Sequence, residues 1–185
     1  MNTTVPSQGY HRWSIILHWA MLGLFVIVYA SIELRVVFER GSTPRATMKD
    51  LHFMFGLAIF ALVWIRLLLR ALTKRPPIVP PPPAWQQLAS TVTHVLLYVF
   101  MIGMPLAGWV TLSAANEPIP FFGLQLPALT GEDMPLALKV NEVHETVGSI
   151  GYWLIGLHAL AGLAHHYLWR DNTLRRMLAS DSRRG

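Results

Sequence analysis

The sequence predicts an all-α integral membrane protein, a four-helix bundle formed by a single domain that spans residues 1–185. Only 14% of the residues are charged and 53% are hydrophobic, whereas about 25% of the residues of a soluble domain are charged. The chain also contains four long apolar segments. Each approaches or exceeds the roughly 20 residues that a helix needs to cross a hydrocarbon layer about 30 Å thick. An ordinary water-soluble globule is therefore excluded.

The four apolar segments give the approximate positions of the membrane spans, which are residues 13–32, 51–69, 85–115 and 146–169. Three of them contain no Asp, Glu, Lys or Arg, and the second contains only Arg66, near its end. The proline-rich residues 76–83 between the second and third spans cannot be helical and form a stiff spacer. In the long connection before the last span, a short separate surface helix is expected near residues 136–140.

Lys and Arg are distributed unequally between the two sides of these spans. The side with both termini and the proline-rich loop carries ten of them, whereas the other side carries five. Because basic residues accumulate on the cytoplasmic side, both termini are expected in the cytoplasm. The net charge of +5 is therefore a signal of topology. It includes no continuous basic stripe that follows phosphates, so we expect no nucleic-acid partner.

Histidines are the main candidates for metal-binding or catalytic residues, because the chain has eight histidines and no cysteine. The absence of cysteine excludes disulfides, thiolate metal sites and covalent c-type haem attachment. His144 and His158 are 14 residues apart, which places them on one face of a helix, about 21 Å apart along its axis. His18 lies in the inner half of the first span and His52 in the outer half of the second. We therefore expect His18 to pair with His158, and His52 with His144.

Two stacked histidine pairs across a helix bundle are what two bis-histidine b-type haems require, because iron binds one imidazole on each axial face. Gly56, Gly148 and Gly162 each follow one of these histidines by four residues. A side chain there would share the ligand's face and obstruct the porphyrin. Helix packing is the alternative explanation for the glycines, and a hydrogen bond to a neighbouring helix is the alternative for any single histidine. Zinc is disfavoured because no level offers three or four ligands.

His94 and His165 lie near the inner ends of the third and fourth spans, beside the expected inner pair. A neutral imidazole can donate or accept a proton near pH 7. Both residues are therefore suited to hydrogen-bond a quinone oxygen, with ordinary interfacial histidines as the alternative interpretation.

The sequence resembles the bacterial cytochrome b561 family over almost its whole length. The most specific matches lie on the fourth span and its tail, and they are His144-Glu145-Thr146, Gly151-Tyr152, Ile155-Gly156-Leu157-His158-Ala159, Leu163-Ala164-His165-His166-Tyr167 and Trp169-Arg170-Asp171-Asn172-Thr173-Leu174. Further matches are His18-Trp19, Arg66-Leu67-Leu68-Leu69-Arg70 and Phe122-Gly123-Leu124.

The resemblance implies a diheme b cytochrome of the bacterial cell inner membrane. The implied axial ligands are His18, His52, His144 and His158, and the implied quinone-binding residues are His94 and His165. The implied activity is that of the superoxide oxidases of this family, which oxidise superoxide to dioxygen at the periplasmic side and pass the electrons to ubiquinone near the cytoplasmic side. Residues 76–83 lack the lysine that relatives supply to the quinone, so Lys74 or Arg75 would have to replace it.

An anionic substrate is attracted by positive potential at the outer mouth. The candidate residues are Arg35, Arg40, Arg45 and Lys49. Eight acidic residues on the same side restrict any such attraction to a local one. The alternative function is a haem b electron-transfer subunit that anchors a periplasmic dehydrogenase or hydrogenase and passes its electrons to quinone. An obligatory partner protein would distinguish this function from the first. A haem-free transporter or scaffold is the third hypothesis.

Overall fold

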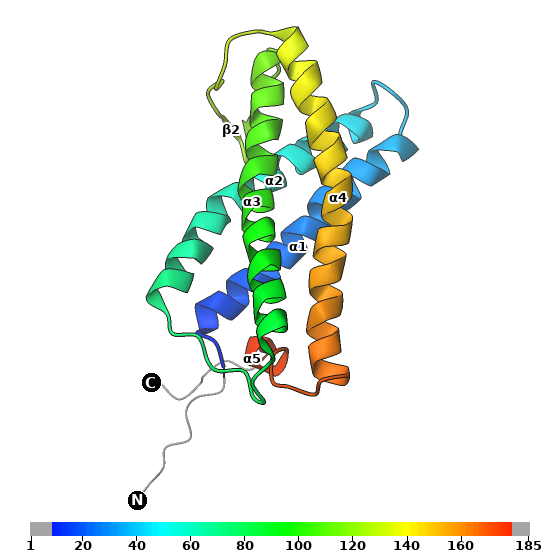
Figure 1. Ribbon diagram of the computed structural model, residues 1–185. Helices are drawn as coiled ribbons and strands as arrows, with labels where there is room; N and C mark the ends of the chain where they lie inside the picture. Colours follow the sequence, from blue (N-terminus) through cyan, green and yellow to red (C-terminus); the bar gives the residue numbers. More distant parts are fainter. Residues whose placement is uncertain (1–8, 179–185) are drawn as a thin grey trace, which may run out of the picture.

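The computed structural model describes residues 9–178 and is dominated by four long helices (Figure 1). They are α1 (Arg12–Leu34), α2 (Thr43–Leu72), α3 (Ala84–Ala114) and α4 (Met134–Tyr167). Each of the four is long and apolar enough to cross a membrane, so the predicted membrane four-helix bundle is confirmed. The short elements are η1 (Arg35–Val37), β1 (Pro120–Phe121), β2 (Leu124–Gln125) and α5 (Arg175–Leu178).

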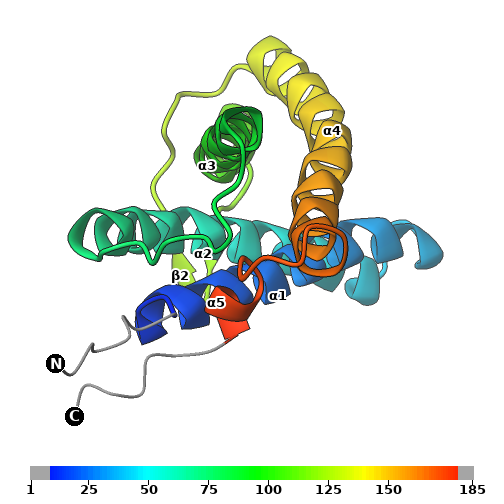
Figure 2. The same cartoon turned by 60° about the horizontal axis from the view of Figure 1, so that its bottom comes forward.

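The helices form two pairs, and α1 and α2 run side by side at an angle to α3 and α4 (Figures 1 and 2). α1 packs along α2, α3 packs along α4, and α2 also contacts α3. The buried core consists of Met21 of α1, Ile59 and Val63 of α2, and Met101 of α3. Ile59 and Val63 lie along α2 between His52 and Arg66. The tightly packed part of the bundle therefore separates the two depths at which the histidines were predicted.

Two helices begin well before their apolar segments. α2 starts at Thr43 and α4 at Met134, where the carboxylate of Asp133 accepts a hydrogen bond from the Leu136 amide at 3.0 Å. The prediction of a separate short helix near residues 136–140 is wrong, because these residues form the first turns of α4. The aspartate cap satisfies one of the free amides at the helix start. These early turns contain charged residues, so a search for apolar segments in the sequence does not include them although they are helical.

The connection between α3 and α4 returns to the outer half of α2. β1 and β2 form a small antiparallel hairpin, and its turn residues Phe122 and Gly123 have φ angles of 48° and 86°. The Phe122 ring lies 5.5 Å from that of Phe55, and its amide approaches the sulfur of Met54 at 3.4 Å. The turn thus directs the Phe122 side chain toward α2. Its positive φ at the second position is favourable for glycine, which accounts for Gly123.

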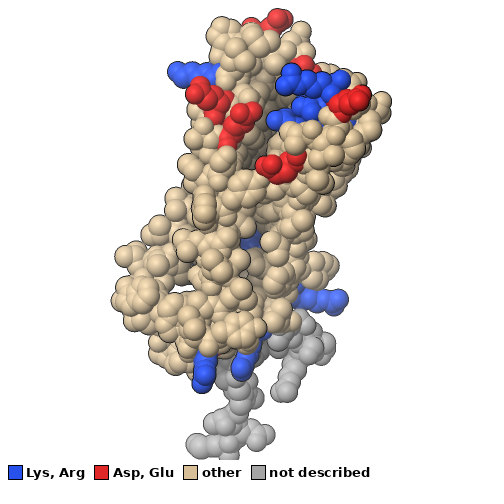
Figure 3. All heavy atoms as spheres, turned by 90° about the vertical axis from the view of Figure 1, so that its right-hand side faces the viewer, with Lys and Arg blue, Asp and Glu red and all other residues tan. Residues whose placement is uncertain are grey.

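Charged side chains gather at the two ends of the bundle and leave a nearly uncharged belt between them (Figure 3). On the face shown, the upper end carries both signs, whereas the lower end of the described part carries only Lys and Arg. The amide of Tyr10 donates to the carbonyl of Arg176 at 3.1 Å, so both ends of the described chain lie together at this basic end. This distribution supports a cytoplasmic position for that end. The termini themselves, with Arg183 and Arg184, lie outside the described residues.

Gly151 of α4 is the point at which a substitution tests the packing of the two helix pairs. A Cβ atom at Gly151 would overlap the Tyr29 hydroxyl and the Phe100 ring, whereas a Cβ at Gly156 would meet no atom within 4 Å. We expect Gly151→Ala to lower the free energy of unfolding by about 1–3 kcal/mol through overpacking. In a chain of this size that is a fall of several degrees in Tm.

The measurement is thermal unfolding in detergent, with Gly156→Ala as the matched control. The control should keep or raise the Tm, because alanine favours a helix over glycine. Equal Tm values for the two variants would contradict the close contact at Gly151.

Candidate functional site

Two pairs of histidine rings face each other at two depths of the bundle. His18 of α1 and His158 of α4 form the inner pair, with ring centroids 6.1 Å apart and ring planes inclined by 72°. His52 of α2 and His144 of α4 form the outer pair, again at 6.1 Å, with an angle of 74°. The structure thus brings together the same partners that helical spacing predicts. All four rings are half-buried, and each pair spans the two helix pairs of the bundle.

The separation of the rings fits two axial ligands of one metal ion. Two imidazoles on opposite faces of a metal place their centroids about 6.2 Å apart, given a metal–nitrogen bond of about 2 Å and a ring centre about 1.1 Å behind the nitrogen. A Cβ atom at Gly56 or Gly162 would meet no atom within 4 Å, so there is room beside one ligand of each pair. Gly148 is closer to its surroundings, with Met104 at 3.5 Å from such an atom. The residues present fit a haem at each depth.

The ring nitrogens have different partners. Nδ1 of His52 lies 3.0 Å from the carbonyl oxygen of Val28. Donation from Nδ1 to a backbone carbonyl leaves the Nε2 lone pair free, as is usual for a metal-binding histidine. Nδ1 of His144 is buried without a hydrogen-bond partner. Nδ1 of His18 accepts from the guanidinium of Arg66 at 3.1 Å. Since Arg only donates, ligation through Nε2 of His18 requires this guanidinium to turn away from Nδ1.

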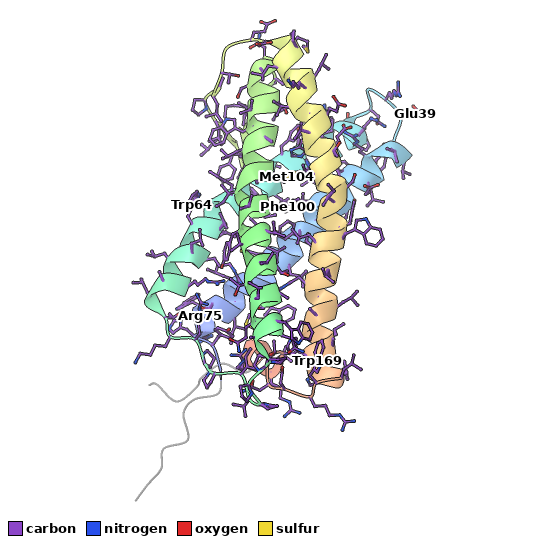
Figure 4. All side chains as sticks on the ribbon, in the orientation of Figure 1. Glu39, Trp64, Arg75, Phe100, Met104 and Trp169 are labelled. Carbon is purple, nitrogen blue, oxygen red and sulfur yellow. The ribbon has the colours of Figure 1, made fainter. Side chains whose placement is uncertain are left out.

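His94 belongs to the inner cluster. Its ring centroid lies 5.3 Å from that of His158, and its Nδ1 lies 2.6 Å from the carbonyl oxygen of Ser90. Arg66, Arg70 and Arg75 are close enough to His94 to interact with it electrostatically. Figure 4 shows Arg75 at the end of the chain segment that leaves α2, at the same end of the bundle as Trp169. Of the two basic residues proposed for the loop, Arg75 is the one that approaches this histidine.

An apolar groove begins next to His94. Its volume is about 370 Å³, and it is lined by Leu67, Val95, Tyr98, Val99, Ile102 and Gly103. These residues come from α2 and α3, and the α3 residues follow His94 directly along the helix. The groove is therefore an apolar surface between α2 and α3 that starts, along α3, at the level of His94 and extends toward the middle of the membrane.

His165 lies two turns beyond His158 on α4 and has a separate set of contacts. Its Nδ1 is 2.5 Å from a carboxylate oxygen of Asp171, and its ring centroid is 4.7 Å from that of Trp169. Sequence reasoning identified His165 but not its carboxylate partner, nor the contact of Arg66 with His18. For Arg66 the signal was present, because it is the only charged residue in the apolar part of its span.

The four basic residues considered for anion attraction have unequal environments. Arg45 donates from Nη1 to the carbonyl oxygens of Arg35 and Phe38, both at 3.1 Å, and so holds the turn after α1. Lys49 Nζ lies 5.9 Å from the centre of the Phe53 ring, which is 6.0 Å from the His52 ring. Arg35 is close enough to His52 to interact with it electrostatically. Arg40 is exposed in the turn before α2. Among these four residues, Arg35 and Lys49 are therefore the ones linked to the outer pair, Arg35 electrostatically and Lys49 through Phe53.

The comparisons with known proteins agree with this geometry. Residues 9–180 match the family described as prokaryotic cytochrome b561. The chain belongs to the prokaryotic cytochrome b561 family. It is 36% identical over 169 residues to "Cytochrome b561 homolog 1" of Escherichia coli (strain K12), which covers 91% of this chain and 96% of that protein.

Two further relatives match at similar length. "Probable superoxide oxidase CybB" of Yersinia pestis is 37% identical over 171 residues, which covers 92% of this chain and 96% of that protein. "Cytochrome b561 homolog 2" of Escherichia coli (strain K12) is 26% identical over 188 residues, which covers 96% of this chain and 92% of that protein. This cytochrome b561 is thus a multi-pass haem b protein of the bacterial inner membrane that transfers electrons, with the lipid bilayer and a quinone-type molecule as its partners.

The two histidine pairs, taken as the expected axial ligands, predict how haem content changes in variants of this cytochrome b561. His18→Ala and His158→Ala should each lose the same haem and leave about one per chain, because one missing axial nitrogen breaks the pair. His52→Ala and His144→Ala should both lose the other haem. The measurement is haem per protein together with low-temperature absorption spectra, which distinguish the two haems.

His94→Ala is the matched control, because His94 contacts His158 but is not assigned as a ligand. It should retain both haems. A variant pair whose members lose different haems, or no loss in any of the four, would overturn the pairing.

Proposed function

We propose that this cytochrome b561 is a superoxide:ubiquinone oxidoreductase with two bis-histidine haem b groups. It oxidises superoxide to dioxygen at the periplasmic side and reduces ubiquinone near the cytoplasmic side. The observation that carries the proposal is the pair of facing histidine rings at each of two depths, with a further histidine beside the inner pair. The relative named as a probable superoxide oxidase, similar over nearly the full length, supports the choice of substrate.

The proposed reaction joins a one-electron donor, superoxide, to a two-electron acceptor, ubiquinone. Two superoxide anions each give up one electron and become two dioxygen molecules, while one quinone takes two electrons and two protons and becomes quinol. Haem iron, when bound, supplies sites that accept and release single electrons. The chain's own residues hold the iron at two levels, separate them by the core around Val63, and present polar groups to the quinone at the inner end.

At the inner end, His94 and His165 are the proposed hydrogen-bonding residues for the quinone carbonyl oxygens. Arg75 supplies positive charge near His94. A guanidinium stabilises the negative charge that grows on the quinone oxygen as electrons arrive before protons. The groove from Val95 to Gly103 suits the apolar tail of ubiquinone, because it starts along α3 at the level of His94 and is lined by apolar atoms.

At the outer end, Lys49 and Arg35 are the proposed residues that attract superoxide toward the outer pair. Within residues 9–178, no Lys or Arg side chain forms an ion pair with an Asp or Glu side chain. Their charge is thus not neutralised by direct contact. Arg45 is committed to the turn after α1 and contributes chiefly to its structure.

The decisive experiment for the proposed function uses the purified chain in detergent, mixed rapidly under anaerobic conditions with superoxide from an aprotic stock. We expect immediate reduction of the haem spectrum, and reoxidation when ubiquinone with a short tail is added, with one quinol per two superoxide. Added superoxide dismutase should abolish the reduction. His165→Ala should slow reoxidation by quinone and leave reduction by superoxide intact.

An isolated chain that superoxide does not reduce would overturn the proposal. Reduction only in the presence of a co-purified dehydrogenase or hydrogenase would favour the alternative function as an electron-transfer subunit. A colourless protein would favour the haem-free scaffold.

Lys49 gives a test of local anion attraction. Lys49→Gln should lower the rate constant for reduction by superoxide about two- to fivefold at low ionic strength, because it removes one positive charge near the outer pair. The difference should disappear near 0.5 M salt, where charges are screened. Lys139→Gln, which removes the same charge from an exposed position at the start of α4, is the matched control. Equal effects of the two variants would show that only the net charge matters.

A further inference from the structure

The end of α4 carries a buried histidine–carboxylate pair that has no role in the haem sites. Nδ1 of His165 lies 2.5 Å from Oδ2 of Asp171. The two side chains are 14% and 3% exposed, so the contact is shielded from water. The second carboxylate oxygen, Oδ1, accepts a hydrogen bond from the amide of Thr173 at 2.8 Å. Each carboxylate oxygen therefore has its own donor.

The chain reverses sharply to form this pair. Arg170 has a φ of 53°, a left-handed conformation that costs a non-glycine residue about 1 kcal/mol or more. The reversal brings the amide of Asp171 to within 3.0 Å of the carbonyl oxygen of His165. A strained turn is maintained only when its surroundings favour it. Here it places a carboxylate within hydrogen-bond distance of Nδ1 of His165, which lies two turns past a proposed haem ligand.

The residues after Asp171 are anchored by a set of contacts that we call the inner clasp, formed by residues 169–177, the loop residues 76–79, Tyr10 and Trp19. Asn172 exchanges hydrogen bonds with Val79, at 2.9 Å through its side chain and 3.2 Å through its amide. Arg176 donates to the carbonyl oxygen of Pro76 and stacks 5.3 Å above the Tyr10 ring. Trp19 Nε1 donates to the carbonyl oxygen of Met177 at 2.9 Å. The clasp thus ties residues 172–177 to the proline-rich loop, to Tyr10 and to α1.

The carboxylate is ionised. Burial raises the pKa of Asp171, but hydrogen bonds from His165 and Thr173 outweigh it and bring the pKa below its ordinary value. An ionised carboxylate can only accept a hydrogen bond, so Nδ1 of His165 donates to it and carries the ring proton of the neutral imidazole. Nε2 then has a free lone pair, and no described residue within 9–178 hydrogen-bonds to it.

We propose that Asp171 is a positioning residue for quinone protonation. It fixes the tautomer and orientation of His165 so that Nε2 faces the quinone oxygen, and it stabilises the imidazolium that forms when Nε2 takes up a proton from the cytoplasmic side. When the quinone has received two electrons, this proton moves from Nε2 to one quinone oxygen, where it forms one of the two O–H bonds of the quinol; the second proton reaches the other oxygen separately. His165 returns to its neutral state and is reloaded for a further turnover. The inference rests on the proposed quinone site, but not on superoxide as the donor.

The test measures electron transfer between ubiquinol and haem in the reverse direction, under anaerobic conditions and without superoxide. One quinol gives up two electrons and two protons, and the two electrons reduce two haems. Asp171→Asn keeps the size of the side chain and an acceptor for the Thr173 amide. It should retain both haem spectra and lower the limiting rate about 10–100-fold, the usual loss when the carboxylate behind a functional histidine is removed. The quinol concentration at half-maximal rate should change less than threefold.

Two comparisons separate positioning from a merely structural role. In a His165→Ala background, Asp171→Asn should cause no further loss, because the two residues act through one contact. Asn172→Ala removes the side-chain contacts to Val79 and Pro77 but leaves the carboxylate, and it should keep the rate within about threefold of wild type. Asp171→Glu, which retains the charge one methylene further out, should fall between wild type and Asp171→Asn.

A wild-type rate in both Asp171→Asn and Asp171→Glu would overturn the inference. So would equal losses in Asp171→Asn and Asn172→Ala, or losses that multiply in the double variant. Failure of superoxide to reduce the wild-type haems would overturn the proposed donor alone, because the quinol reaction is measured without it.

Discussion

This bundle depends on one constraint: α4 must stay at a distance from both α1 and α2. Facing imidazoles 6.1 Å apart cannot form where helix backbones pack closely, and backbone contacts between α1 and α4 are few within residues 9–178. A membrane helix already satisfies its own backbone hydrogen bonds, so it can be held apart from a neighbour without leaving polar groups unpaired. The bundle consequently separates into two helix pairs that meet at a few points.

Those points of contact are made by side chains other than the four facing histidines. Met21, Ile59, Val63 and Met101 form a core between the two levels. Tyr29 reaches from α1 to the carbonyl oxygen of Gly148 at 2.9 Å. The hairpin lies against α2 at the outer end, and the inner clasp ties the chain ends to the proline-rich loop at the other. These contacts hold the bundle together and leave space between the facing histidine rings. A uniformly packed four-helix core would leave no such space.

The sequence predicted the parts of this arrangement that depend on helical geometry. A spacing of 14 residues places His144 and His158 on one face whatever surrounds them. Helix starts were harder to predict, because Asp133 and the charged residues after it are helical outside the apolar layer, and hydropathy detects the layer rather than the helix. The partner of His165 was not predictable, since it depends on a left-handed turn at Arg170 that no local pattern indicates.

The two ends of the molecule differ in the groups that handle charge, and this difference matters for the proposed direction of electron flow. At the inner end, His94 is close to three arginines and His165 has a carboxylate, so groups able to carry protons are next to the basic end of the bundle. At the outer end, the hydroxyl of Tyr152 donates to Glu33 at 2.7 Å, and the cations linked to the outer pair are Lys49 and Arg35. The outer end thus agrees with the proposed substrate, an anion that carries one electron and needs no proton. The inner end carries groups that can add protons, and within residues 9–178 the core around Val63 between the two ends contains no charged side chain.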